Sequence, residues 1–168
     1  DIFLNAKVGK NIWQKAKSSF GASSVKILDT EEQLDLITPE GTKVTFFQDD
    51  YKNLFLPETN QVINFLDKRD IALNKAFTLG RRPKWRDYVD LYFIFKNKYI
   101  SLGRLINLSK RKFKNDFSER LFLEQLVYWD DVNDYEIEFM SEVALPEVIK
   151  TFLTLEAKKY KDKQLLQI

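Results

Sequence analysis

The hydrophobic pattern changes its period partway along the chain, and this change restricts the possible folds. Before residue 50, apolar residues alternate with polar ones, as they do in half-buried strands. After Asn60 they recur every three to four residues, as they do in amphipathic helices. Strands first and helices second predict an α+β fold, with a mixed β-sheet followed by a C-terminal helical bundle.

Four segments of the first part have the strand pattern: Asp1–Leu4, Val25–Leu28, Leu34–Ile37 and Lys43–Gln48. In the second part, Asp70 is typical of an N-cap ahead of a helix that Gly80 would end, and Pro83 is typical of the next helix start. We therefore place a sheet region at residues 1–59 and a helical bundle at residues 60–168. Everything after Asn60 is expected to be helical.

Two residue types that carry much of enzyme chemistry are missing, because the chain has no histidine and no cysteine. Disulfides, thiolate metal sites and serine–histidine triads are therefore excluded. What remains is a carboxylate–metal centre, a lysine, or no catalysis at all. The lack of cysteine fits a reducing cytoplasm. No apolar run approaches the roughly 20 residues that a membrane-spanning helix needs.

Lys75 lies on the apolar face of the first predicted helix of the bundle, with Ala72, Ala76 and Leu79 as neighbours. A lysine at the edge of a core can extend outward to water, which is a purely structural role. The functional interpretation is an ammonium group held against a substrate phosphate. The sequence leaves both interpretations open.

A charged cluster formed by Arg86, Asp87 and Asp90 opens the next helix, which is otherwise almost wholly apolar. Residues three and four apart on a helix can meet, so these side chains can share adjoining faces. Structural explanations exist, because the helix dipole favours a carboxylate in the first turn and an Arg86–Asp90 pair would neutralise Asp90. A buried unpaired charge costs several kcal/mol (roughly), so the cluster is also a candidate site.

Other charged groups have weaker functional readings. Basic residues gather in two groups that would attract phosphates: Arg81, Arg82, Lys84 and Arg86, and then Lys110, Arg111, Lys112 and Lys114. For the second group a solvated helix end is the default interpretation, with RNA contact as the alternative. The acidic segment WDDVND lacks the glycine and terminal glutamate of an EF-hand, which favours a surface loop. Asp49 and Asp50 are similarly interpreted as a solvated turn.

Three stretches of the chain resemble the AbiEii/AbiGii-type toxin family of the nucleotidyltransferase superfamily. The family's lysine helix followed by R-D-x-x-D-L is similar to Lys75 and Arg86–Leu91 here. The strand that often reads V-x-V-D-F-F in the family is similar to TKVTFFQ. A late Y-F-D-D segment and a W-x-x-V-K-x-F-like helix are similar to YWDDVNDYEIEFM and LPEVIKTF. The resemblance extends over nearly all of the chain.

The resemblance implies a nucleotidyltransferase-like sheet whose carboxylates hold Mg²⁺, and a helical bundle that completes the active-site cleft. Asp1-Ile-Phe-Leu looks like the second Asp of a D-x-D metal motif with its strand, so Asp1 is the expected metal ligand. A G-G/S loop and the first Asp of the motif are then expected upstream. Thr45 stands where many relatives have a further carboxylate, and a hydroxyl is a poor metal ligand by comparison. Asp90 could supply the missing charge.

The function implied by the resemblance is that of a cytoplasmic toxin, with a cognate antitoxin protein as a partner. It would transfer a nucleotidyl or phosphoryl group from an NTP to an RNA such as tRNA, with Mg²⁺. Lys75, Asp87 and Asp90 would be catalytic, and a second set would bind phosphate: Arg82, Lys84 and Arg86. We expect Asp1 and Asp90 across one pocket. The alternatives are a catalytically degenerate binding or regulatory module, which Thr45 favours, and an unrelated α+β protein.

Overall fold

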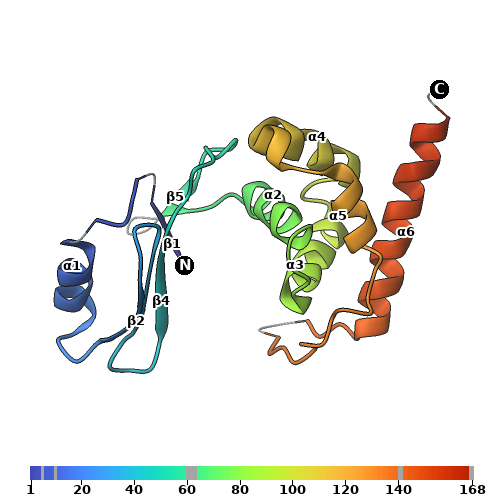
Figure 1. The fold of residues 1–168 in the computed structure, drawn as a ribbon. Coiled ribbons are helices and arrows are strands. Elements are labelled where there is room, and N and C mark those ends of the chain that lie inside the picture. Colours follow the sequence, from blue (N-terminus) through green and yellow to red (C-terminus); the bar gives the residue numbers. More distant parts are fainter. Residues whose placement is uncertain (5, 10, 60–63, 140–141, 167–168) are drawn as a thin grey trace. The chain divides into compact units, whose positions relative to one another are not determined.

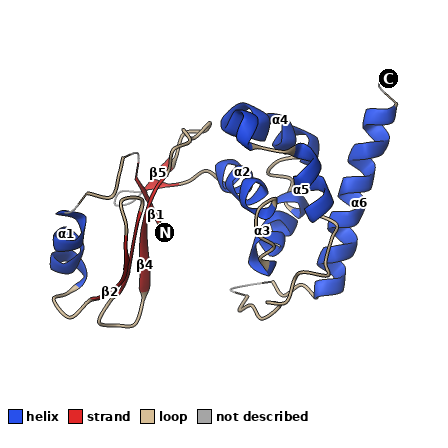
Figure 2. Cartoon of the chain, viewed as in Figure 1, coloured by secondary structure: helices blue, strands red, loops and turns tan. Residues whose placement is uncertain are grey.

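The computed structural model describes residues 1–4, 6–9, 11–59, 64–139 and 142–166. The chain forms two compact units, Asp1–Lys52 and Asn53–Ile168 (Figure 1). The first unit contains a four-stranded sheet and one helix, and the second is mainly helical (Figure 2). The predicted α+β fold, a mixed sheet followed by C-terminal helices, is confirmed. The predicted boundary at residue 60 falls on residues 60–63, which lie outside the described residues.

The first unit has one helix, which lies between its first and second strands in the sequence. In chain order its elements are β1 (Ile2–Leu4), α1 (Asn11–Phe20), β2 (Val25–Asp29), β3 (Gln33–Ile37) and β4 (Lys43–Gln48). The strand order is β1-β4-β3-β2, in which β1 runs parallel to β4 and the other neighbours are antiparallel. All four predicted strands are therefore confirmed. Gly21, with a φ of 110°, follows the last residue of α1.

The two faces of this sheet differ in burial. Leu34 and Leu36 are buried on one face. On the same face, the ring centroid of Phe46 lies 6.5 Å from that of Phe20 in α1. Successive side chains of a strand point to opposite faces, so Phe3 and Phe47 occupy the other one. Their rings meet edge to face at 6.2 Å, and they are 41% and 40% exposed. This second face is therefore the more open of the two.

The second unit begins with a short hairpin and continues as helices. Its elements are β5 (Glu58–Thr59), β6 (Asn64–Phe65), α2 (Lys68–Leu79), α3 (Trp85–Lys96), α4 (Leu102–Phe113), the 3₁₀ helix η1 (Lys114–Asp116), α5 (Glu119–Gln125) and α6 (Pro146–Leu165). β6 pairs with β5, so the expectation that everything after Asn60 is helical was wrong for these residues. From Leu73 to Leu126, a stretch described without gaps, no strand occurs.

The core of the second unit forms around α2, which packs against α3, α4 and α5. Leu73, Ala76 and Leu79 of α2 are fully buried, and Leu105 and Leu153 are fully buried on α4 and α6. Among the described residues, no helix combines the length and the apolar content that crossing a bilayer requires.

Two helix starts differ from the prediction. Asp67, not Asp70, is the N-cap of α2, and its carboxylate accepts the Arg69 backbone N–H at 2.8 Å. Asp70 is buried in the first turn instead, where it has another partner. α3 begins at Trp85 rather than at Pro83. Gly80 ends α2 as predicted.

Candidate functional site

The predicted lysine and the two predicted carboxylates meet on neighbouring helices of the second unit. The Nζ atom of Lys75, on α2, lies 2.7 Å from Oδ1 of Asp87 and 2.7 Å from Oδ2 of Asp90, both on α3. The three side chains differ in access to water: Asp87 is 2% exposed, Lys75 24% and Asp90 46%. The cluster therefore runs from a buried carboxylate, through the ammonium, to an accessible carboxylate.

The local sequence explains this arrangement. The tight turn between α2 and α3 lets the helices pack side by side, with Ala76 and Leu91 in their buried faces. Asp87 and Asp90 are three residues apart, so both reach the same side of α3. The structural alternative of an Arg86–Asp90 pair is not the arrangement found, because Asp90 pairs with Lys75 and Arg86 is exposed. Asp87 is held by more than the helix dipole, because it has a direct cationic partner.

The electrostatics of the cluster favour a charged lysine. Burial disfavours the ammonium, but the hydrogen bonds to Asp87 and Asp90 outweigh it and raise the pKa of Lys75 above its ordinary value. One cation between two carboxylates leaves a formal excess of one negative charge. The Oδ2 atom of Asp87 is buried and has no hydrogen-bond partner among the described residues. The cluster is therefore ordered without being fully satisfied.

The basic residues predicted to bind phosphate have different surroundings. Arg82 and Arg86 have exposed side chains. The ammonium of Lys84 lies 3.7 Å from Asp134, whose other carboxylate oxygen accepts the Trp85 backbone N–H at 3.0 Å. Asp134 thus acts as a helix cap for α3 from a distant loop, a role that replaces the missing side-chain cap of Lys84.

Asp1, the predicted metal ligand, is exposed at the start of β1 in the first unit. Ile2 lies opposite Phe46, so Asp1 stands beside Thr45 by register, and Asp35 of β3 lies opposite Thr45 on the other side. Asp1 and Asp35 thus flank Thr45. Hydrogen bonds from Gln33 and Lys43 hold the pKa of Asp35 below its ordinary range, although burial opposes them.

Asp1, Thr45 and Asp35 fit Mg²⁺ only in part. Carboxylate oxygens are suitable ligands, but the Asp35 carboxylate is 2.7 Å from the Lys43 ammonium. Nowhere in the described part of the chain do three or more potential ligands (His, Cys, Asp or Glu) gather in a way that could hold a metal ion. The expected pocket between Asp1 and Asp90 would involve both units, and it stays a prediction.

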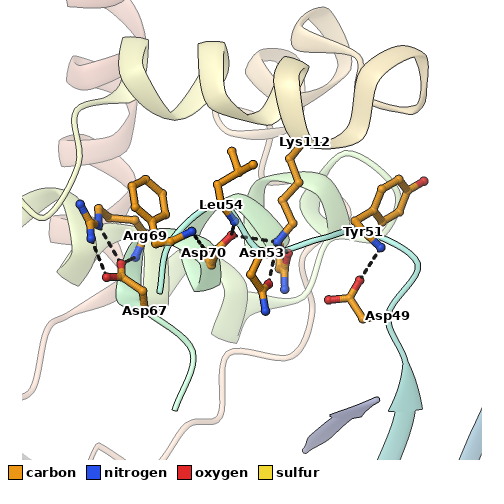
Figure 3. A network of polar contacts seen from close by, with 10 residues as sticks. Asp49, Tyr51, Asn53, Leu54, Asp67, Arg69, Asp70 and Lys112 are labelled. Carbon is orange, nitrogen blue, oxygen red and sulfur yellow. Dashed lines mark hydrogen bonds and ion pairs between the residues drawn. The ribbon is translucent and has the colours of Figure 1, made fainter. Parts of the chain in front are cut away.

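Sequence reasoning missed a second charged cluster, in which Lys112 of α4 pairs with Asp70 of α2 at 3.0 Å (Figure 3). Both side chains are 0% exposed. The expectation of a solvated helix end was therefore wrong for Lys112. A signal was available, because Lys112 shares the helical spacing of Leu105 and Ser109, which are buried on the same helix.

The two acidic segments are local structure. In WDDVND, Asp134 caps α3 and Asp131 accepts from the side-chain amide of Gln125 at 3.2 Å. After β4, the Asp49 carboxylate accepts the Tyr51 backbone N–H at 3.0 Å, and Asp50 accepts from the side-chain amide of Gln48. These contacts agree with a capping loop and a turn.

Comparison with known proteins gives a relative without an assigned function. The chain is 30% identical over 124 residues to "Uncharacterized protein aq_aa25" of Aquifex aeolicus (strain VF5). The aligned region covers 72% of this chain and 58% of that protein. The chain thus spans somewhat more than half the length of this relative. No protein-family model matches the sequence, and no solved structure matches it.

Proposed function

We propose that this protein transfers a nucleotidyl or phosphoryl group from an NTP to an RNA acceptor such as tRNA. The observation that supports this proposal best is the setting of Lys75. Its ammonium is held between the buried carboxylate of Asp87 and the half-exposed carboxylate of Asp90. A cation fixed in place stabilises developing phosphate charge well, because it needs no reorganisation during the reaction. The resemblance of this motif to the nucleotidyltransferase toxins supplies the reaction class.

Each charged residue has a role in the proposal that matches its exposure. Lys75 would offset the charge that develops on the phosphoryl oxygens. Asp90, at 46% exposed, would accept the proton of the attacking hydroxyl. Asp87, at 2% exposed, would position Lys75 and keep it charged. The exposed Arg82 and Arg86 would bind phosphates of the NTP or the RNA.

Mg²⁺ would neutralise the triphosphate and orient the leaving group. We assign Asp1 to it as one ligand, and we assign no reaction step to the metal. The resemblance also supports a cytoplasmic toxin that a cognate antitoxin neutralises, and these assignments belong to the same proposal.

A second candidate is a binding or regulatory module that has lost catalysis. Thr45 favours it, because a hydroxyl stands where many members of the toxin family that the chain resembles have a carboxylate. The neighbouring Asp35 does not obviously compensate, since its charge is already paired with Lys43.

One experiment distinguishes the two candidate functions. The chain is incubated with total tRNA, Mg²⁺ and each NTP, labelled on either the α or the γ phosphate. Label on RNA from the α position identifies nucleotidyl transfer, and label from the γ position identifies phosphoryl transfer. Lys75→Ala and Asp90→Asn should each remove most of the turnover, and Lys159→Ala, which breaks a surface pair with Glu156 on α6, should not.

Turnover that survives Lys75→Ala in a folded protein would remove Lys75 from the reaction. Binding of NTP or tRNA without turnover under any of these conditions would favour the binding module instead.

A further inference from the structure

The two basic groups of the sequence come together in the second unit, where the end of α2 meets the end of α4. The Arg81 guanidinium, just after α2, donates to the backbone carbonyl of Asp116 at 2.6 Å, in the 3₁₀ helix that follows α4 directly. One turn earlier, the Phe77 ring of α2 stacks on the Phe113 ring of α4, with the centroids 4.2 Å apart. The chain after Phe77 and the chain after Phe113 therefore lie side by side.

Three basic side chains in these two segments are exposed: Arg82, Arg111 and Lys114. Among the residues that the structure describes, none of the three has an ion-pair partner. Two acidic residues lie near them in the sequence, Asp116 and Glu119, and Glu119 is already paired with Lys110. The surface therefore keeps an excess of positive charge, and such a surface attracts phosphates.

The backbone of Lys114 indicates that this lysine is not required by the fold. Its φ is 52° and its ψ is −126°, a combination that glycine adopts readily and that residues with a Cβ atom adopt only with strain. A glycine would relieve this strain, so local structure gives no reason for a lysine here. Strained residues gather at binding sites, and the exposed ammonium is the part of Lys114 that could serve one.

A small cavity lies beside these residues, between α2 and α5, which pack against each other (Figure 1). Its volume is about 150 Å³, and its walls include Phe77, Arg81, Phe117 and Leu121. A cavity of roughly this size can hold one aromatic ring as large as benzene. The Arg81 guanidinium already stacks on the Phe77 ring, 3.6 Å from its centroid. Aromatic rings and guanidinium planes are the groups on which unpaired bases stack.

We propose that this end of the helical unit binds single-stranded RNA. The phosphates would contact Arg82, Arg111 and Lys114, and one unpaired base would enter the cavity beside Arg81. The cavity favours a nucleic acid over other polyanions, because it takes a flat ring. Arg81 follows Lys75 by six residues, which is about 9 Å along a helix axis, so RNA held here would reach the candidate site. The choice of RNA rests on the proposed function, which this inference deepens by naming the surface that holds the acceptor.

Salt-dependent binding measures the phosphate contacts. A fluorescent single-stranded RNA is titrated with the whole chain, without NTP, at several salt concentrations. Each lost phosphate contact lowers the slope of log K against log salt by about 0.7, so Arg111→Ala/Lys114→Ala should lower it by about 1.4 and weaken binding at least about fivefold. Lys158→Ala/Lys163→Ala removes two exposed charges from α6 and should change neither value. Equal losses in the two double variants would overturn the proposal, because binding would then follow net charge.

Position 114 separates binding from folding. Lys114→Gly should raise the melting temperature, because it relieves the strained backbone, and should still weaken RNA binding. Lys114→Ala should weaken binding equally without that rise, and Lys114→Arg, which keeps the charge, should keep most of the affinity. Unchanged RNA affinity in Lys114→Gly would remove Lys114 from the interface, and a lower melting temperature would refute the argument from strain.

Crosslinking tests the cavity. A single-stranded RNA that contains photoreactive thiouridine is irradiated with the wild-type chain, and mass spectrometry maps the crosslinked peptides. Crosslinks should fall within residues 76–81 or 116–121, which line the cavity. They should disappear when the same RNA is annealed to its complement, because a paired base cannot enter. Crosslinks that lie only elsewhere, or that form equally with the duplex, would overturn the base contact.

These measurements do not depend on catalysis, since no NTP is present. RNA binding at this surface without transfer under any condition would keep the interface and reject the transferase. Transfer with a KM for RNA that is unchanged in Arg111→Ala/Lys114→Ala would keep the transferase and reject the interface.

Discussion

Lys75 and Asp87 are 12 residues apart on successive helices, and their 2.7 Å ion pair ties the middle of α2 to the first turn of α3. Asp90 lies at the same distance from the same ammonium. The two carboxylates differ in burial, at 2% and 46% exposed, and so they should respond differently to the same substitution.

Asp87→Asn should cost about 1.5–3 kcal/mol of unfolding free energy, because a buried charged hydrogen bond to Lys75 is replaced by a neutral one. Asp90→Asn should cost less than about 1 kcal/mol, since its pair is half-exposed and screened by solvent. Urea unfolding at neutral pH measures both. An equal cost for the two variants would show that exposure does not decide their roles.

The stability of the protein should fall at alkaline pH through Tyr88. Burial raises the pKa of Tyr88 to about 12 from 10.0, against an opposing hydrogen bond with Gln125. The folded state holds this proton more tightly than the unfolded state. Stability from Tyr88 is therefore complete below pH 10 and is lost as the pH rises towards about 12. Tyr88→Phe should lose less stability over this interval, which thermal melts at several pH values can detect.

Asp134 should stabilise α3 although it lies 49 residues from the helix start. Asp134→Ala removes the acceptor of the Trp85 N–H and should cost about 0.5–2 kcal/mol, as the loss of a helix cap does. Asp130→Ala, in the same loop and exposed, is the matched control and should be near neutral. Comparable costs for both variants would contradict the capping role.

Local patterns predicted the fold well because strand and helix periods depend on neighbouring residues. Period-two patterning located all four strands of the sheet. Lys75, Asp87 and Asp90 were identified as charged residues on otherwise apolar helices, and they form one cluster. The helix starts were less certain, since Asp67 and Asp70 are equally good caps by residue type. Only tertiary burial distinguishes them, because Asp70 is turned toward Lys112.

The remaining site features depend on contacts between distant segments. Lys112 and Asp70 are 42 residues apart, and no local period links them. The capping of α3 by Asp134 has the same character, because a loop supplies what Lys84 cannot. The buried face of α4 could have identified Lys112 as unusual, but its partner could be found only in the folded chain.

The coupling between Asp70 and Lys112 should be strong when each is removed in turn. Lys112→Met leaves the Asp70 carboxylate buried without a cation and should cost about 3–5 kcal/mol. Asp70→Ala should cost a similar amount. Lys112 then keeps only the side-chain oxygens of Asn53 and Asn74, and the two backbone N–H groups bound by the carboxylate lose their acceptor. The double variant leaves no buried charge, so its cost should be well below the sum and close to the roughly 1–3 kcal/mol of the orphaned N–H groups. Chemical denaturation of all four proteins gives this cycle, and additive costs would mean that the two charges do not stabilise each other.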